Sequence, residues 1–230
     1  MEPISKEDLL TYFYCPDCGS SDLVAVTDAI VCRACHRQYP EKHGVIDFLL
    51  YDQLSESEKR ELKAMTLPLD RQKLQWIVEK EKWDRIQTHF LMRGIRAAMR
   101  YLSKYNRLGK TLVTLGSGAG FELRVLSEFI SFDKIIASDI SWSASHAIRM
   151  SVEARTGMLG LFTCDFNRCP VKRSSEMVCF VFEALHHTDN VHMTIENLIS
   201  KNFDHIVFVE PTRNWLINSV SRPAGRFIME

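Results

Sequence analysis

The sequence predicts an α/β protein with a doubly wound, mainly parallel sheet, a small cysteine-rich β unit before it and a helical linker between them. Residues 110–210 alternate short apolar runs with stretches of helical periodicity, as strand–helix–strand units do. Two Cys-x-x-Cys pairs lie close together near the start of the chain. Residues 55–106 show helical spacing and no strand-like alternation. We therefore expect three segments, at residues 1–50, 51–109 and 110–230.

Composition excludes several classes of protein. The chain of 230 residues is 46% hydrophobic and 25% charged, which is ordinary for a globular protein and not for a disordered one. Its 29 Lys and Arg balance 29 Asp and Glu, so no net charge draws it to nucleic acid or to an anionic membrane. The sequence has no apolar run of bilayer length and no signal peptide. We expect a cytoplasmic protein whose seven cysteines stay reduced.

The four N-terminal cysteines have the spacing of a tetrahedral metal site. Cys15 and Cys18 form one Cys-x-x-Cys pair, Cys32 and Cys35 form the other, and the residues between them read as strand, turn and strand. Two such knuckles supply four thiolates, which close the coordination of a structural Zn²⁺ and leave no position for catalysis. The alternative is four buried thiols in an unrelated hairpin. We predict a zinc ribbon whose metal provides most of its folding energy.

The linker contains a capped helix and a basic stripe. SESEKREL begins like a helix with acidic residues in its first turn. Further on, five cations recur every three or four residues and would share one helix face: Arg93, Arg96, Arg100, Lys104 and Arg107. This stripe is a candidate site for RNA phosphates or an acidic partner, although charge runs are more commonly a solvated surface. Gly94 argues against a continuous helix here.

A glycine-rich turn opens the third segment. TLVTL reads as a buried strand and FELRVL as a helix, and between them Gly116, Gly118 and Gly120 have the spacing G-x-G-x-G, with Ser117 after the first. Strand, glycine turn and helix form the context of a nucleotide-binding loop, because glycine lets the backbone approach a ligand closely. The dinucleotide fingerprint needs a glycine where this chain has Phe121, so the spacing argues against a dinucleotide.

Acidic residues stand at the ends of the strands that follow. KIIASD ends at Asp139, which Ile140 follows, and LGLFTCD ends at Asp165, which Phe166 follows. MVCFVF runs out into Glu183 and then into two histidines. In a parallel sheet these ends meet at one edge, where an acid can accept hydrogen bonds from the ribose hydroxyls of an adenosyl ligand.

Residues 110–215 resemble class I S-adenosylmethionine-dependent methyltransferases, which have a Rossmann-like fold. The resemblance rests on LGSGAG, Asp139, Asp165 with Phe166, and the EALHH segment. It implies that Asp139 binds the ribose of S-adenosylmethionine and that Asp165 lies beside its adenine amino group. The full cofactor site that it implies is Gly116, Ser117, Gly118, Gly120, Asp139, Ile140, Asp165 and Phe166.

Residues 10–50 resemble the zinc-ribbon domain that precedes many of these enzymes and also occurs alone as an activator of tRNA and protein methyltransferases. The shared pieces are the two knuckles, Tyr39-Pro40 and the run GVIDFL. The order of ribbon, helical linker and methyltransferase also matches a known arrangement in the family.

The EALHH segment resembles a run found in the small-molecule branch of this family, and this resemblance favours methyl transfer to a small molecule or metabolite. His186 and His187 follow the strand beside which the methyl group would lie, so each is a candidate general base. Glu183 is a candidate to bind an acceptor amine or hydroxyl. The alternatives are that these residues shape the pocket, pack or cap a helix. Two other functions stay open: an RNA methyltransferase that uses the ribbon and the basic stripe, and a non-catalytic scaffold with a methyltransferase fold.

Two departures from the family pattern bear on these functions. The acid that usually stands two residues before the first glycine is Thr114 here, with Glu122 as a candidate substitute. The family usually has seven strands, but only nineteen residues follow Pro211, and they read as a helix. We expect either a fragment or a five-stranded sheet in the order 3-2-1-4-5, whose fifth strand is an open edge. A helix of the chain would cover this edge, or a second copy would pair with it as a homodimer.

Overall fold

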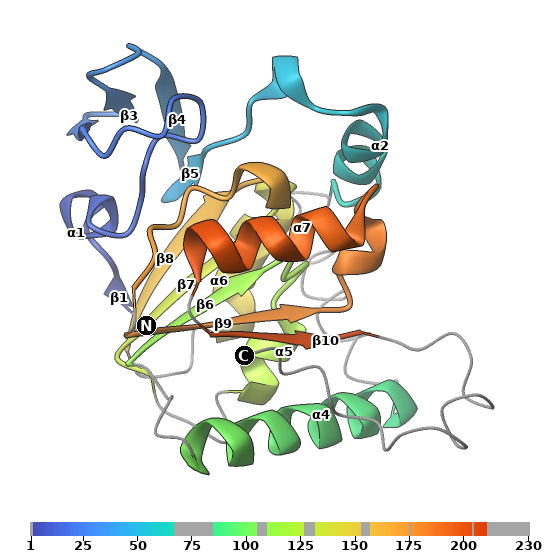
Figure 1. Ribbon diagram of the computed structural model, residues 1–230. Coiled ribbons are helices and arrows are strands. Elements are labelled where there is room, and N and C mark those ends of the chain that lie inside the picture. The colour runs from blue at the N-terminus through green and yellow to red at the C-terminus, as the bar shows by residue number, and fades with distance from the viewer. Residues whose placement is uncertain are drawn as a thin grey trace.

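Five parallel strands form the centre of the structure, a computed structural model that describes residues 2–66, 85–104, 110–126, 132–152, 157–174, 176–203 and 205–210. The strands are β6 (Thr111–Leu115), β7 (Lys134–Asp139), β8 (Met158–Thr163), β9 (Met177–Phe182) and β10 (Ile206–Val209). Their spatial order is β10-β9-β6-β7-β8. This is the doubly wound order that the sequence predicts, read from the fifth strand to the third (Figure 1).

Helices cover both faces of this sheet (Figure 1). They are α4 (Arg85–Lys104), α5 (Phe121–Leu126) and α6 (Trp142–Val152) on one face, and α7 (Val191–Asn197) with the π-helical turn Leu198–Asn202 on the other. Because successive strand residues point to opposite faces, Leu112 packs in a buried cluster with Ile95 of α4, whereas Val113 belongs to the cluster of Leu198. Within the described residues, no helix combines the length and apolar character that crossing a bilayer requires.

The N-terminal segment is joined to the central sheet by strand pairing. After α1 (Lys6–Leu10), the antiparallel strands run β2 (Leu23–Val26), β3 (Ala29–Cys32), β4 (Gln38–Lys42) and β5 (Val45–Asp47). β5 then pairs in parallel with β8, with Ile46 opposite Phe162. The short strand β1 (Glu2–Pro3) pairs with the start of β8, so that both cover the edge that β8 would otherwise expose. The sequence predicts the ribbon but not this junction.

A buried carboxylate fixes the point where the chain leaves the sheet. Asp47 accepts hydrogen bonds from the backbone N–H of Leu49 (3.3 Å), the hydroxyl of Tyr51 (2.7 Å) and the hydroxyl of Thr163 in β8. The chain continues through a 3₁₀ turn (Tyr51–Gln53) into α2 (Glu56–Ala64). The Asp47 side chain therefore links the ribbon, β8 and the linker.

Helix α4 packs on β10, the last strand of the described sheet on this side. α4 is continuous through Gly94, although a glycine inside a helix weakens the sequence signal for one. A Cβ atom at this position would lie 3.2 Å from Cγ1 of Val209 in β10, so the glycine allows close approach of the helix. α4 thus covers part of β10, one of the two options that the sequence left for this edge. The predicted C-terminal helix lies outside the described residues, and the homodimer stays a prediction.

Replacing Asp47 tests the junction between ribbon and sheet. Asp47→Ala leaves the buried Thr163 hydroxyl and the Tyr51 hydroxyl without their acceptor, and an unsatisfied buried group costs about 1–3 kcal/mol. We expect the free energy of unfolding in urea to fall by about that amount. Asp47→Asn keeps a carbonyl oxygen and is expected to cost less. The same stability for Asp47→Ala and the wild type would show that this carboxylate does not hold the junction.

Candidate functional site

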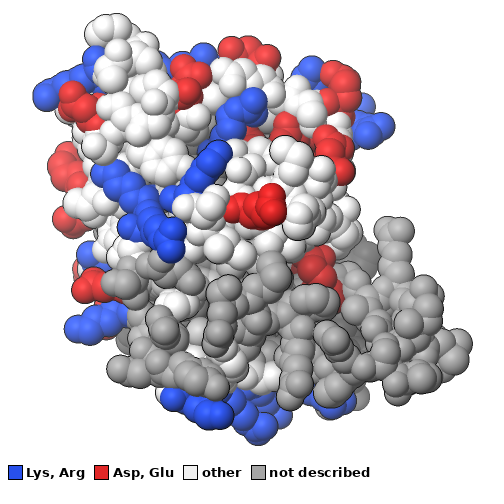
Figure 2. All heavy atoms as spheres, viewed as in Figure 1, with Lys and Arg blue, Asp and Glu red and all other residues white. Residues whose placement is uncertain are grey.

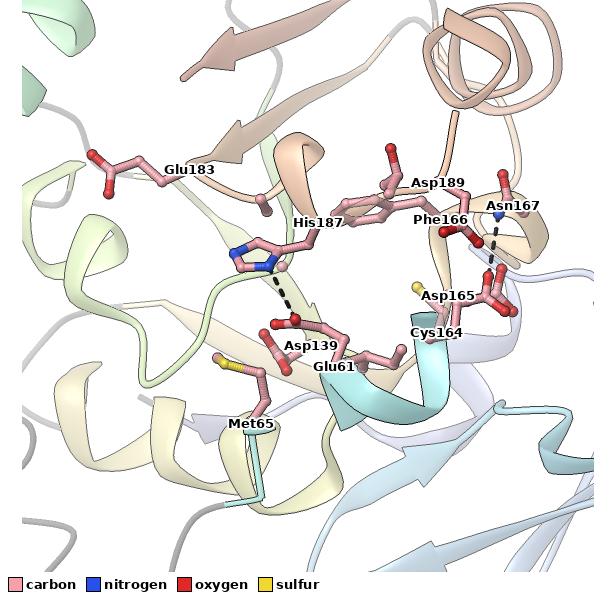
Figure 3. A pocket seen from close by; sticks show the side chains of 15 residues that line it. Glu61, Met65, Asp139, Cys164, Asp165, Phe166, Asn167, Glu183, His187 and Asp189 are labelled. Carbon is pink, nitrogen blue, oxygen red and sulfur yellow. Dashed lines mark hydrogen bonds and ion pairs between the residues drawn. The ribbon is translucent and has the colours of Figure 1, made fainter. Parts of the chain in front are cut away.

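A cleft lies at the carboxyl ends of β6, β7, β8 and β9, the edge at which the sequence predicts a ligand site. The space between the residues that line it is about 670 Å³, with the open solvent at its mouth included. Gly116, the strand ends around Asp139 and Asp165, and the turn after β9 form one side. Glu61 and Met65, from α2 and its C-terminal cap, form part of the other side (Figure 3).

The glycine turn has the backbone conformation that its sequence predicts. Gly116, Gly118 and Gly120 have φ angles of 68°, 48° and 83°, a region that favours glycine. Gly116 lines the cleft, and a Cβ atom there would lie 2.5 Å from Cβ of Ala184. The buried Ser117 hydroxyl donates to Oγ1 of Thr114 at 2.7 Å. Gly116 therefore faces the space for a ligand, while Ser117, Gly118 and Gly120 shape the turn.

Two buried acids flank the same side of the cleft. Asp139 accepts hydrogen bonds from the backbone N–H groups of Gly118 (2.9 Å) and Ser141 (3.0 Å), and Asp165 accepts one from that of Arg168 (2.8 Å). Burial raises the pKa of both carboxyls. The hydrogen bonds to Asp139 oppose the rise in its pKa, and the charge of Glu61 adds to it. Both acids line the cleft, as do Ile140 and Phe166.

The three residues predicted to act on the methyl acceptor, Glu183, His186 and His187, take different positions in the turn after β9. His187 lines the cleft, and its Nδ1 lies 3.0 Å from Oε2 of Glu61 (Figure 3). Nδ1 of His186 instead lies 2.8 Å from Oε2 of Glu210, at the end of β10. Glu183 has a φ angle of 46° and lines the cleft, but it stands apart from the other labelled side chains in Figure 3.

The sequence predicts helix α2 but does not predict that this helix lies at the cleft. Its capping box, formed by Ser55 and Glu58, explains why the helix begins where it does. The same two residues also contact the core, because the Ser55 hydroxyl donates to Asp189 (3.0 Å) and the Asn167 amide donates to Glu58 (3.2 Å). No residue of α2 is buried. Polar contacts therefore hold the helix at the cleft, and no local sequence pattern marks their distant partners.

The four N-terminal cysteines form a second site, within the ribbon. The Sγ atoms all lie within 4.8 Å of one another, and the Cys15–Cys35 and Cys18–Cys32 pairs are 3.6 Å apart. A disulfide needs about 2.05 Å, whereas tetrahedral coordination with metal–sulfur bonds of about 2.3 Å places sulfurs about 3.8 Å apart. The hydroxyl of the buried Tyr39 lies 2.9 Å from Sγ of Cys15. The donor set therefore fits a four-coordinate metal ion.

The basic stripe lies away from the cleft. Arg93, Arg96, Arg100 and Lys104 are exposed on α4, and Arg107 lies outside the described residues. Lys and Arg side chains gather along the lower edge of the molecule in Figure 2, where α4 lies in Figure 1. None of the four described cations lines the cleft.

Several solved methyltransferase structures are similar to this chain, whereas no protein-family model and no curated protein matches it. One is a complex between the Haloferax volcanii Trm112 methyltransferase activator and a methyltransferase (22% identity, TM-score 0.38, covering 56% of this chain and 53% of that one). Another is magnesium protoporphyrin IX methyltransferase from Synechocystis PCC 6803 with bound S-adenosylmethionine (15% identity, TM-score 0.49, covering 70% of this chain and 79% of that one). A third is an S-adenosylmethionine-dependent methyltransferase from Aquifex aeolicus (17% identity, TM-score 0.42, covering 60% of this chain and 70% of that one).

The match spans about half the length of the first of these chains. The strand order of the central sheet and the cluster of four cysteines agree with the Rossmann-like sheet and the cysteine ribbon that the sequence predicts.

The glycine turn makes a testable prediction about stability. Gly116→Ala and Gly118→Ala both place an alanine at positive φ, but only the new methyl at position 116 overlaps another residue, Ala184. A Cβ at Gly118 would instead meet Met65 at an ordinary 3.6 Å. Overpacking costs about 1–3 kcal/mol, so we expect Gly116→Ala to melt below Gly118→Ala by a margin of that size. Equal melting temperatures would contradict the tight contact between the turn and Ala184.

Proposed function

We propose that the chain transfers a methyl group from S-adenosylmethionine to a small-molecule or metabolite acceptor. The observation that carries this proposal is the meeting of Gly116, Asp139 and Asp165 in one cleft at the ends of adjacent parallel strands. In the proposal Asp139 accepts hydrogen bonds from the ribose hydroxyls and Asp165 from the adenine amino group. The remaining residues of the cofactor site are Ser117, Gly118, Gly120, Ile140 and Phe166. The cofactor supplies a methyl group on a positively charged sulfur, so the protein's tasks are placement of the acceptor and removal of its proton.

The charge of the cleft favours this acceptor class over RNA. Its lining includes six carboxylates, at Glu58, Glu61, Asp139, Asp165, Glu183 and Asp189, and no Lys or Arg among the described residues. Carboxylates attract a sulfonium and repel phosphates. RNA methylation, the second candidate, is supported by the exposed cations of α4, which lie outside the cleft.

Among the acceptor-side residues, we propose His187 as the candidate base and Glu183 as a candidate contact for the acceptor. Both line the cleft, whereas His186 is held against Glu210 at the end of β10. A base must come within hydrogen-bond reach of the proton that it removes, and only a residue that lines the cleft can touch an acceptor bound there.

Titration with S-adenosylmethionine in a calorimeter tests the proposed cofactor. Asp139→Ala removes a charge-assisted acceptor worth about 1.5–3 kcal/mol, so we expect the affinity to fall about 10- to 150-fold. Asp133→Ala is the matched control, because Asp133 is an exposed acid just before the same strand, outside the cleft. An unchanged affinity of Asp139→Ala would show that the cofactor, if bound, lies elsewhere.

The acceptor class follows from a second readout of the same protein. Wild-type chain and S-adenosylmethionine with a labelled methyl group are incubated with a cell extract, which is then separated into small molecules, RNA and protein. We expect the label in the small-molecule fraction. Label in RNA would instead support the second candidate. Cofactor binding without transfer to any fraction would support the non-catalytic scaffold.

We also propose that the ion held by Cys15, Cys18, Cys32 and Cys35 is zinc, with a structural role. Freshly purified protein should carry one zinc per chain in metal analysis. Tyr39→Phe removes the hydroxyl next to Cys15, and loss of such a partner typically weakens metal affinity about 10- to 100-fold, measured by competition with a chelator. Tyr12→Phe, whose hydroxyl contacts Lys134 outside the ribbon's metal site, should leave it unchanged. Protein purified without zinc would overturn the assignment.

A further inference from the structure

Two adjacent histidines in the turn after β9 each face a carboxylate, but only one of them faces the cleft. The rings of His186 and His187 lie 4.1 Å apart. His186 pairs with Glu210 of the central sheet, and His187 pairs with Glu61 of α2. The two pairs have the same chemistry, a histidine beside a glutamate, but only the pair of His187 and Glu61 lies at the cleft. Comparing them shows which features of His187 come from its place at the cleft.

The pair of His186 and Glu210 braces the main chain of the turn. Oε1 of Glu210 accepts hydrogen bonds from the backbone N–H groups of Ala184 (2.9 Å) and Leu185 (2.7 Å), while Oε2 contacts His186. Both carboxylate oxygens are thus engaged in holding the turn that presents His187. Glu210 acts on the backbone and not on the His187 ring.

The pair of His187 and Glu61 fixes the ring itself. Glu61 Oε2 lies 3.0 Å from Nδ1 of His187. An ionised carboxylate can only accept a hydrogen bond, so this contact requires the proton on Nδ1. In the neutral ring Nε2 then carries a lone pair and can accept a proton.

We propose that Glu61, on helix α2, is a positioning residue that holds His187 in the tautomer whose Nε2 removes the proton of the methyl acceptor. The proposal rests on the proposed function and adds a residue from outside the central sheet to it. It also makes the acceptor a neutral group with a proton to lose, such as a hydroxyl, an N–H or an acidic C–H.

The proton and the electrons balance in this step. Nε2 of His187 takes the acceptor's proton while the acceptor's electron pair forms the bond to the methyl carbon, and the electron pair of the broken carbon–sulfur bond stays on sulfur. The charge that leaves the sulfonium thus appears on the His187 imidazolium, next to the Glu61 carboxylate. His187 then releases its proton to solvent.

The position of Glu61 ties this base to the placement of α2. The helix is held to the core by Ser55 with Asp189, Glu58 with Asn167, and Glu61 with His187, and it has no buried residue. The orientation of the His187 ring therefore depends on α2 keeping this position at the cleft.

The tautomer of His187 can be read directly by long-range ¹H–¹⁵N correlation spectra of the full chain, with His187→Gln to assign the ring signals. In spectra recorded at a pH where the ring is neutral, we expect a protonated Nδ1 and an unprotonated Nε2 in the wild type. Glu61→Ala should give a mixture of tautomers, whereas Glu56→Ala, an exposed acid on the same helix, should leave the spectrum unchanged. A wild-type ring protonated on Nε2, or a Glu61→Ala spectrum like that of the wild type, would overturn the proposal.

The rate of methyl transfer is the second measurement, made with the fraction of the extract that wild-type protein labels. General base catalysis contributes about 10²–10⁴-fold, so we expect His187→Gln to lose about that factor in kcat and Glu61→Ala to lose at least about tenfold. Full activity of Glu61→Ala would also contradict the proposal. Because the spectra need no cofactor, they decide the tautomer of His187 separately, so a failure of the proposed function and a failure of the Glu61 contact can be told apart.

Discussion

The parallel pairing of β5 with β8 is the contact on which the rest of the arrangement depends. It turns the last strand of the ribbon into a strand of the central sheet and covers an apolar edge that would otherwise be open. The buried Asp47 side chain accepts a hydrogen bond from Thr163 across this junction, and the chain then continues to α2. Without the junction, α2 would have no fixed starting point from which to reach the cleft.

The cleft is therefore assembled from segments far apart in the sequence. The central sheet contributes the glycine turn and two buried acids, whose raised pKa values show that burial outweighs their hydrogen bonds. The linker contributes Glu61 and the polar contacts around it. The ribbon contributes the anchor from which the linker starts, and its four cysteines could hold a metal ion that would stabilise so small a unit.

Local patterns in the sequence predict the elements, and long-range pairings limit what can be predicted of the site. The glycine turn, the strands ending at Asp139 and Asp165, and the cysteine knuckles each follow from a few neighbouring residues. The partner of β5 does not, because GVID pairs with residues more than a hundred positions away. Glu61 looks like any exposed acid on a capped helix, and only the three-dimensional structure brings it to His187. The same limit left His186 and His187 equivalent in the sequence.

A crystal structure of the chain with S-adenosylhomocysteine tests the central claim most directly. The account predicts the ligand in the cleft, with its ribose hydroxyls on the Asp139 carboxylate, its adenine beside Asp165 and its amino acid end over the turn at Gly116. It also predicts that α2 stays over the ligand with Glu61 on His187. Ligand bound at any other place, or a cleft that stays empty at saturating ligand, would contradict the account.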